Sequence, residues 1–344
     1  MNKKHNFWRI TLDTNPDFCN LNCTMCEDHS PYSESKASRK KRGTLRPNMD
    51  KALLEKVIRE AYEMGISEII PSTMGEPLIY PDFEVFLDLC HELGLKLNLT
   101  TNGTFPSSEK HQSVEFWARR IIPIGSDVKI SWNGATPETH DAIMLKASLD
   151  QHIQNAKRFI AVRDELARDN YCSVTMQLTF MRSNLEEIPD MVRLAIDLGF
   201  DRIKGHQLWS HFPELKQQSL RNDIVYAERW NQIVDICHAI ANGNGINPAS
   251  IRLDNFNKLE VSNSKDITLE GECPFLGKEI WVDPNGRFNV CCAPDQERKN
   301  LGYFGNLREN SLKEIISSDS YIDLKNNYHT KKLCQDCNMR RPNE

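Results

Sequence analysis

The sequence predicts an α/β fold: a partial (β/α)6 barrel, similar in plan to an incomplete TIM barrel, followed by a smaller C-terminal domain. Over residues 7–242, apolar runs of strand length alternate with segments of helix length, which is typical of parallel βαβ units. Three of the expected helices end at Gly65, Gly94 or Gly199 directly before a strand, and glycine is a common helix stop signal. In such a fold, functional groups lie at the carboxyl ends of the strands.

The elements follow in order. The expected strands span residues 7–13, 66–71, 95–101, 127–132, 172–180 and 202–208. The expected helices span residues 49–64, 82–93, 108–121, a helical region through Glu165, 185–198 and 223–241. The segment 30–48 is rich in Ser, Lys and Arg, so we expect a solvated loop there. A lid or a basic contact for an anionic substrate is the functional alternative for this segment.

Composition excludes several classes of protein. A chain of 344 residues suits one large domain plus a smaller one. Lys and Arg total 43 against 48 Asp and Glu, and this balance argues against a nucleic-acid partner. The N-terminus lacks a signal peptide and no apolar run approaches a membrane span, so no membrane partner is expected. Eleven cysteines without a secretion signal indicate reduced thiols that bind metal in the cytoplasm.

Three cysteines, Cys19, Cys23 and Cys26, follow the first expected strand. Their spacing allows three thiolates to bind one small inorganic cluster. Three ligands on a four-iron cluster leave one iron open to a substrate or cofactor. The alternative is a zinc knuckle with His29 as the fourth ligand.

Polar segments follow the later strands as well. They are Ser-Thr-Met-Gly-Glu-Pro at 72–77, Thr-Thr-Asn-Gly at 100–103, Ile-Ser-Trp-Asn-Gly with Pro-Glu-Thr over 130–139, and Met-Arg-Ser-Asn at 181–184. With the cysteine triplet, these segments resemble the radical S-adenosylmethionine (SAM) superfamily. Met74 stands where that family usually has a glycine, and Asn133 where it usually has Asp.

The resemblance implies a [4Fe-4S] cluster on the three cysteines and SAM bound at its open iron. It also implies a set of SAM contacts: Met25, Gly75, Glu76, Pro77, Thr101, Asn102, Ser131, Asn133 and Arg182. A guanidinium suits the SAM carboxylate, but Arg182 could equally be a turn residue whose neighbour Asn184 caps the helix. His206 and Gln207 are expected to form a packed polar pair, with a substrate-facing position as the alternative.

A second cysteine group lies near the C-terminus. Strand-like runs at 278–283 and 287–292 flank Pro284-Asn285-Gly286 and predict a β-hairpin, and a short helix is expected at 311–316. Four thiolates are enough for a complete [4Fe-4S] cluster. They come from Cys273, Cys291, Cys334 and Cys337. This part resembles the Twitch module, the half-sized relative of the SPASM domain, and we expect domains at 1–245 and 246–344.

Other assignments of these cysteines remain open. Cys292 is either spare or replaces Cys291, and zinc on the same thiolates is the structural alternative to a second cluster. Cys90, Cys172 and Cys237 lie in expected helices or strands and are expected to be buried packing residues.

The resemblance implies a radical SAM oxidoreductase with two [4Fe-4S] clusters. An external one-electron donor of the flavodoxin or ferredoxin type would support SAM cleavage to a 5′-deoxyadenosyl radical, and the auxiliary cluster would accept an electron in a net oxidation. The expected reaction is dehydrogenation or bond formation in a small molecule or a short peptide, because no extension precedes the first strand. The sequence does not identify a catalytic base. The alternatives are a maturase of leader-bearing ribosomal peptides and a non-catalytic zinc scaffold.

Overall fold

The chain folds into two compact units, each built from separate stretches of sequence. The computed structural model describes residues 6–72, 74–106, 113–167, 171–221, 223–243, 251–260, 271–335 and 337. The first unit comprises Met1–Pro16, Arg46–Leu97 and Asn263–Glu344; the second comprises Asp17–Leu45 and Asn98–Ser262. The expected domain boundary after residue 245 falls outside the described residues and stays a prediction.

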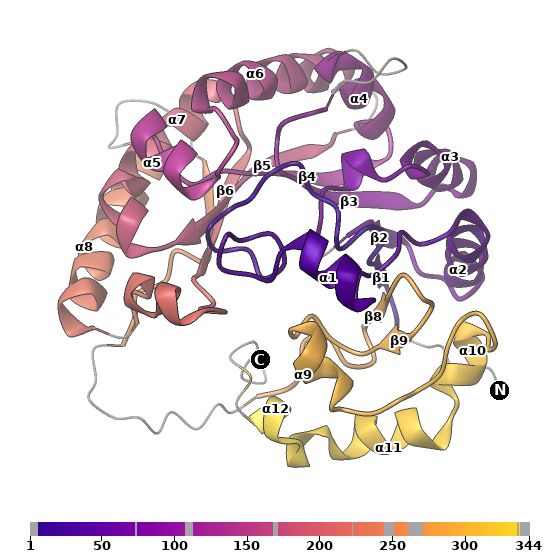
Figure 1. The fold of residues 1–344 in the computed structure, drawn as a ribbon. Coiled ribbons are helices and arrows are strands. Elements are labelled where there is room, and N and C mark those ends of the chain that lie inside the picture. The colour runs from indigo at the N-terminus through magenta and orange to yellow at the C-terminus, as the bar shows by residue number, and fades with distance from the viewer. Residues whose placement is uncertain are drawn as a thin grey trace. The chain divides into compact units, whose positions relative to one another are not determined.

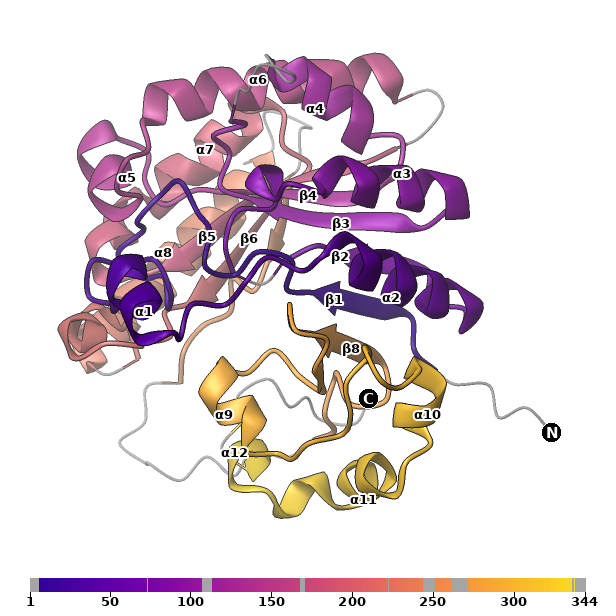
Figure 2. The same ribbon diagram turned by 45° about the vertical axis from the view of Figure 1, so that its right-hand side comes forward.

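The first unit is built around β1 (Arg9–Leu12), which pairs in parallel with strands on both sides. One neighbour is β2 (Glu68–Ile70), and the other is β8 (Glu279–Val282), which turns back into the antiparallel β9 (Phe288–Asn289). Figure 2 shows β8 beside β1. The turn between β8 and β9 confirms the hairpin expected around Pro284-Asn285-Gly286. Its pairing with β1 was not predicted.

Helices complete the first unit. They are α2 (Lys51–Glu63), α3 (Phe83–Leu93), α9 (Asp295–Lys299), α10 (Leu312–Ile316), α11 (Asp319–Asn327) and α12 (Lys332–Gln335), with short 3₁₀ turns η1 (Pro77–Ile79) and η5 (Tyr328–Thr330). The expected helices near 49–64, 82–93 and 311–316 are confirmed. The sequence analysis missed α9, α11 and α12.

The second unit is a parallel α/β layer. β3 (Lys96–Thr101) begins in the first unit, where it pairs with β2, and leads into the second. The strand order continues through β4 (Gly125–Ser131), β5 (Ser173–Phe180), β6 (Arg202–Gln207) and β7 (Arg252–Asp254). The pairs β4–β5, β5–β6 and β6–β7 are all parallel. The six expected strands are confirmed; β7 was not predicted.

Helices line the outer side of these strands (Figure 1). They are α4 (Val114–Ile121), α5 (Pro137–Ile143), α6 (Leu149–Leu166), α7 (Ile188–Leu198) and α8 (Ile224–Ala241), with 3₁₀ turns η2 (Arg182–Glu187) and η3 (Pro213–Gln218). The beginning of the helix expected at 108–121 lies outside the described residues. Because side chains alternate along a strand, Val128 and Ile130 of β4 are buried on one face while Lys129 and Ser131 lie on the other.

The expectation of a solvated loop is wrong for part of segment 30–48. Residues Lys36–Arg42 form helix α1, with Ser35 at its N-cap and Gly43 in the left-handed conformation at its end. Arg39 is largely buried and donates to Asp17 at 2.6 Å. A buried ion pair of this kind holds the helix in place, which a charge-rich sequence alone does not reveal.

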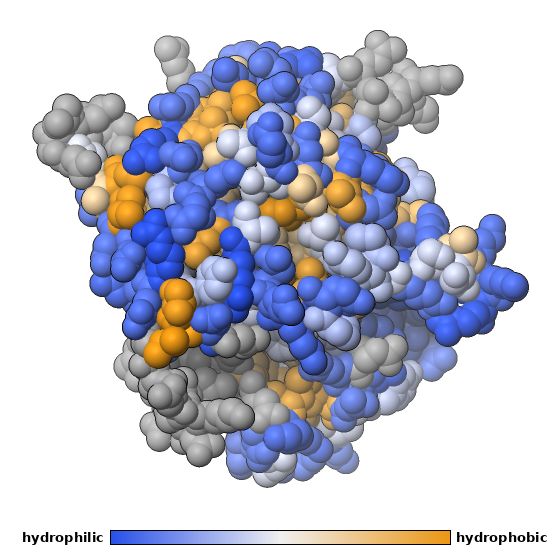
Figure 3. Space-filling model, turned by 60° about the vertical axis from the view of Figure 1, so that its left-hand side comes forward, coloured by the Kyte–Doolittle hydropathy of each residue, from blue (hydrophilic) through white to orange (hydrophobic). Residues whose placement is uncertain are grey.

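No helix in the described parts of the chain is long and apolar enough to cross a membrane. The face drawn in Figure 3 is mainly hydrophilic, with apolar groups in separate small patches.

Candidate functional site

The first three cysteines lie in the loop that follows β1, and all three are half-buried. The amide of Cys26 donates to the carbonyl of Cys23 at 3.1 Å, which closes a turn between them. Sulfur atoms in this loop receive N–H groups: Leu21 donates to Cys19 Sγ at 3.4 Å, and the amides of Asp28 and His29 donate to Cys26. Burial raises the pKa of the Cys26 thiol. Such N–H donors stabilise the thiolates that a metal cluster requires.

Asn102 ties this loop to the end of β3. Its side-chain amide donates to Asn20 Oδ1 at 2.7 Å and approaches Cys19 Sγ at 3.7 Å. The side-chain oxygen of Asn102 accepts from the amide of Thr104 at 3.0 Å. Both polar ends of this buried side chain are therefore engaged, which fixes the loop relative to the strand.

Two buried histidines, His152 and His140, lie between the backbone of Asn102 and the backbone of Asn133. His152 Nε2 donates to the Asn102 carbonyl at 2.5 Å, and its Nδ1 lies 3.2 Å from the Ser148 carbonyl and 3.4 Å from His140 Nε2. The Nδ1 of His140 then accepts from the amide of Asn133 at 3.5 Å. Burial, and then the neighbouring His152, lower the pKa of His140 to about 3, and burial lowers that of His152. The lowered pKa values favour the neutral form of both rings.

This histidine pair joins the ends of β3 and β4, which carry two of the expected SAM contacts, Asn102 and Asn133. His140 and His152 were not predicted from the sequence to be part of the site. The two rings lie edge to face, with centroids 4.9 Å apart, and the buried Trp132 packs against both. Because both rings are buried, we interpret them as positioning residues that hold the carboxyl ends of β3 and β4 in place.

The remaining expected SAM contacts of the second unit are Ser131 and Asn133, at the end of β4, and Arg182, which is already paired within the protein. Asn133 Oδ1 accepts from the amide of Thr179 at 2.9 Å, and Ser131 is half-buried on the polar face of β4. Arg182 is engaged within the protein: its guanidinium bonds Asp223 at 3.2 Å and stacks 3.9 Å from the centroid of the Tyr226 ring. A SAM contact for Arg182 stays a prediction, and so do the contacts of Ser131 and Asn133.

Asn184 caps the turn after β5, which agrees with the alternative in which Arg182 is a turn residue and Asn184 is the cap. Its Oδ1 accepts from the amide of Met181 at 3.0 Å, and its side-chain amide donates to the carbonyl of Asn133 at 3.1 Å. At the end of β6, the expected packed polar pair is wrong for His206, whose side chain is exposed. Gln207 is half-buried.

Apolar side chains surround the cysteine loop. Cys19, Cys23 and Met25 pack against a buried group consisting of Leu21, Ile143, Met144, Met181, Leu208 and Leu215. Thr101 is buried and its hydroxyl accepts from the amide of Gly103. A low-polarity shell limits the access of water to a cluster bound at this loop.

The Gly75-Glu76-Pro77 segment belongs to the first unit. Gly75 has a φ of 76°, a conformation that few residues other than glycine adopt. Glu76 is buried, accepts from the amide of Leu78 at 3.1 Å and offers its carbonyl to the side chain of Asn15 at 2.7 Å. Pro77 starts η1. The segment is thus rigid, and its expected contact with the SAM amino group stays a prediction.

The C-terminal cysteines gather in the first unit. Burial raises the pKa of the Cys291 thiol to about 11, and both Cys273 and Cys337 lie close enough to contribute electrostatically. Leu276 donates its amide to Cys273 Sγ at 3.4 Å. Cys334 lies in α12 and is half-buried. Cys292, which is exposed, also lies within electrostatic range of Cys291 and Cys337, so it stays an alternative ligand.

These donor sets fit iron–sulfur clusters. All the expected ligands are cysteine sulfurs, several receive N–H groups, and none of the cysteines forms a disulfide. Among the residues that the structure describes, no three Cys, His, Asp or Glu side chains converge as they would around one metal ion. The burial of Cys90, Cys172 and Cys237 confirms them as packing residues.

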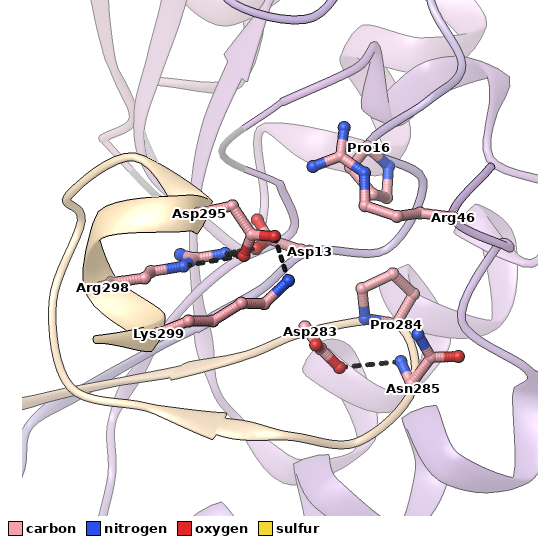
Figure 4. A pocket seen from close by; sticks show the side chains of 9 residues that line it. All are labelled: Asp13, Pro16, Arg46, Asp283, Pro284, Asn285, Asp295, Arg298 and Lys299. Atoms are coloured by element: carbon pink, nitrogen blue, oxygen red, sulfur yellow. Dashed lines mark hydrogen bonds and ion pairs between the residues drawn. The ribbon is translucent and has the colours of Figure 1, made fainter. Parts of the chain in front are cut away.

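A small polar cavity of about 40 Å³ lies in the first unit between the end of β1, the β8–β9 turn and α9 (Figure 4). Arg298 points between Asp13 and Asp295 and donates to them at 2.8 and 3.0 Å, and Lys299 pairs with Asp295. This volume holds no more than a few water molecules. The cavity therefore does not serve as a substrate site.

Comparison with known proteins agrees with this geometry. The family described as the radical SAM superfamily matches residues 16–195, and the SPASM iron–sulfur cluster-binding domain matches residues 273–338. The chain is 24% identical over 335 residues to the tungsten-containing aldehyde ferredoxin oxidoreductase cofactor-modifying protein of Pyrococcus furiosus, covering 94% of this chain and 85% of that protein.

Two further similarities concern proteins linked to peptides. A PqqA peptide cyclase of Methylobacterium nodulans is 27% identical over 188 residues, which are 54% of this chain and 43% of the cyclase. The crystal structure of Streptococcus suis SuiB bound to SAM superposes with a TM-score of 0.67 at 17% identity, over 98% of this chain and 73% of SuiB. At this identity the superposition shows a shared fold.

Proposed function

The chain belongs to the radical SAM superfamily and carries a C-terminal SPASM iron–sulfur domain, and on this premise we propose that it catalyses the net oxidation of a small molecule or a short peptide. It is a radical SAM enzyme that uses a [4Fe-4S] cluster and SAM. When bound, these two supply a 5′-deoxyadenosyl radical that abstracts hydrogen from a substrate. The finer reaction, dehydrogenation or bond formation, is the proposal.

The observation that carries the proposal is the pair of cysteine-only donor sets. Cys19, Cys23 and Cys26 would hold the cluster that binds SAM, while the four C-terminal cysteines would hold a second, fully coordinated cluster. A net two-electron oxidation needs an acceptor for the electron that remains after hydrogen abstraction. The four C-terminal cysteines would hold the cluster that accepts this electron, and an external flavodoxin- or ferredoxin-type protein would supply the electron that starts each turnover.

The chain's own residues would hold and orient the reactants. Asn102 fixes the cysteine loop through Asn20, and the neutral histidines behind it fix Asn102. Ser131 and Asn133 at the end of β4 would contact SAM, and the rigid turn at Glu76 would receive its amino group. Such preorganisation lowers the cost of aligning cofactor and substrate.

A leader-bearing ribosomal peptide is a second candidate substrate, favoured by two of the similar proteins. The PqqA peptide cyclase has similarity to the chain over 188 residues, and SuiB has been crystallised with its precursor peptide SuiA. The relative from Pyrococcus furiosus, named for modification of a cofactor, favours a small molecule instead. Leader-bearing ribosomal peptides would be distinguished from small molecules by testing precursor peptides encoded near the gene.

Metal content is the first test. After anaerobic reconstitution, two four-iron clusters require about eight irons and eight sulfides per chain. The Cys334→Ala variant should lose about half of this iron and keep some SAM cleavage, whereas Cys237→Ala, which changes a buried packing residue, should keep both clusters. Stoichiometric zinc without sulfide would instead support a non-catalytic scaffold.

SAM cleavage is the second test. With dithionite as reductant, the wild-type enzyme should form 5′-deoxyadenosine, and Cys19→Ala should form none because the cluster loses one of its three protein ligands. Retention of 5′-deoxyadenosine formation in Cys19→Ala would show that this loop does not hold the catalytic cluster.

A further inference from the structure

The strands of the second unit carry a charged network on their polar face. Arg202 of β6 donates to Thr175 Oγ1 at 3.0 Å, and Thr175 donates to Asp127 Oδ1 at 2.6 Å. Lys129 lies 3.1 Å from Asp127, and Arg202 lies 3.1 Å from Asp254. These bonds link β4, β5, β6 and β7 across one face. Both carboxylates of the network are fully used by Lys129, Arg202 and Arg252.

Lys204 lies beside this network without joining it. It is half-buried, and no hydrogen bond or ion pair connects its amine to any residue that the structure describes. Burial, and then the positive charges of Lys129 and Arg202, lower its pKa. Asp254 stands opposite Lys204 in the β6–β7 register, but its carboxylate pairs with Arg202 and Arg252. Asp254 and Asp127 attract the Lys204 amine only partly, because both carboxylates are shared with other cations, so the amine can still pair with a further anion.

The strand register places Lys204 level with the expected SAM contact on β4. Ser131 pairs with Gln177, and Gln177 pairs with Lys204, so the three residues form one row across β4, β5 and β6. Side chains in such a row point to the same side of the sheet. Two strand spacings separate Ser131 from Lys204, or about 10 Å. This distance suits a substrate held between Lys204 and a cofactor at Ser131.

His206 stands in the next row towards the carboxyl end of β6, level with Thr179. Although His206 is exposed at the strand end, desolvation by the surrounding protein, and then the charges of Lys204 and Lys129, lower its pKa to about 4. The ring accepts from, or donates to, the side chain of Asn255 at 3.4 Å. The positive charges of Lys204 and Lys129, which contribute to the lowered pKa of His206, also attract an anion.

We propose that Lys204, with Gln177 as a neighbouring amide donor, forms a subsite that binds an anionic group of the substrate, either a carboxylate or a phosphate. The inference rests on the proposed function, because it places this group beside the cofactor site at Ser131. It narrows the substrate class to molecules or peptides that carry such a group. Lysine acts as a point charge and accepts either anion.

The test measures whether small anions protect Lys204 in the reconstituted full-length enzyme. Lysines are reductively methylated under anaerobic conditions, with and without acetate or inorganic phosphate, and the rate at each site is read by peptide mass spectrometry. A probe at twice its Kd should slow methylation of Lys204 about threefold, because only the unbound fraction reacts. The exposed Lys157 of α6 serves as reference and should not change.

Two controls separate binding from ionic strength. Sodium chloride at equal ionic strength, and the neutral acetamide, should leave Lys204 unprotected. The Lys204→Met variant, which keeps the length of the side chain without its charge, should lose the acetate- or phosphate-dependent rise in unfolding temperature, and Lys204→Arg should keep it. If Lys204→Met does not fold, the protection experiment on the wild-type enzyme still decides.

The outcomes are distinct. Protection by acetate alone indicates that the subsite binds a carboxylate group, and protection by phosphate alone indicates that it binds a phosphate group. Protection by both indicates that it binds anions without distinguishing these two groups. Equal methylation with every probe, or equal protection by chloride, overturns the inference. SAM cleavage measured on the same preparation keeps the two proposals apart: cleavage without protection refutes only the anion subsite, and protection without cleavage refutes the proposed function.

Discussion

Replacement of Arg298 by methionine should destabilise the protein strongly. Arg298 is 6% exposed, and its guanidinium donates to Asp13 at 2.8 Å and to Asp295 at 3.0 Å. Asp13 itself is 3% exposed. Methionine preserves most of the volume but removes the cation that Asp13 and Asp295 share, although Asp295 keeps its pair with Lys299. Loss of one partner of a buried ion pair costs about 3–5 kcal/mol, and we expect a decrease of this size in the free energy of unfolding.

The matched control is Arg59→Met, in the same unit. Arg59 bonds Glu92 through two nitrogens, but both side chains are about half exposed, at 48% and 55%. An exposed pair contributes about 0–1 kcal/mol, so this variant should unfold close to the wild type. The two substitutions are chemically identical, and burial is what distinguishes their sites.

Urea unfolding followed by circular dichroism, with iron content measured in each sample, provides the assay. The double variant Asp13→Asn with Arg298→Met should be more stable than Arg298→Met alone, because it removes a stranded charge. A loss in Arg298→Met no larger than that in Arg59→Met would refute the argument. So would a double variant in which the two losses simply add.

Three further predictions concern the second unit. Asn102→Ala should weaken the hold on Cys19, raise the KM for SAM and speed the loss of iron to a chelator; an unchanged rate of loss would contradict the anchoring role. Folded His140 binds fewer protons than unfolded His140, so stability should fall as the pH drops below about 6.5, and His140→Phe should flatten that slope in urea midpoints between pH 5.5 and 7.5. Gly205→Ala should cost about 1–3 kcal/mol, because its Cβ would meet the Phe180 ring at 1.8 Å; a wild-type unfolding midpoint would disprove this overpacking.

Local patterns were enough to predict most of the fold. The six strands and the helices between them follow from apolar periodicity and from glycines such as Gly94 and Gly199, which adopt the left-handed conformation at helix ends. The β8–β9 hairpin follows from its turn residues. These signals lie within short windows of sequence, which is why they could be read without a structure.

Non-local contacts could not be predicted in the same way. β8 pairs with β1 although about 270 residues separate them in sequence, as the bond between Arg9 and Glu279 shows. Neither segment has a sequence feature that predicts this pairing. β7 has three residues, too few for a clear pattern. The charged segment 30–48 was expected to be solvated because its ion pair partners, Asp17 and Asp28, are identified only once the chain has folded.

The candidate site shows the same division. The cysteine ligands could be proposed from spacing, because cluster binding imposes short intervals on the sequence. Lys204 could not, since its isolation depends on Asp127 and Asp254 being paired with other cations. His140 and His152 could not either, because two helices must pack before their rings meet.

Asn133 stands where the family usually has Asp, and it also contacts the buried histidine pair, His140 and His152. The position is 1% exposed, and its amide donates to His140 Nδ1, which must therefore lack a proton. An aspartate there would bury a negative charge at a position that is 1% exposed, which costs free energy unless the charge is paired. Asparagine keeps the hydrogen bond to the Thr179 amide without adding that charge. Asn133 thus bonds both His140 and Thr179 at this buried position without adding a charge.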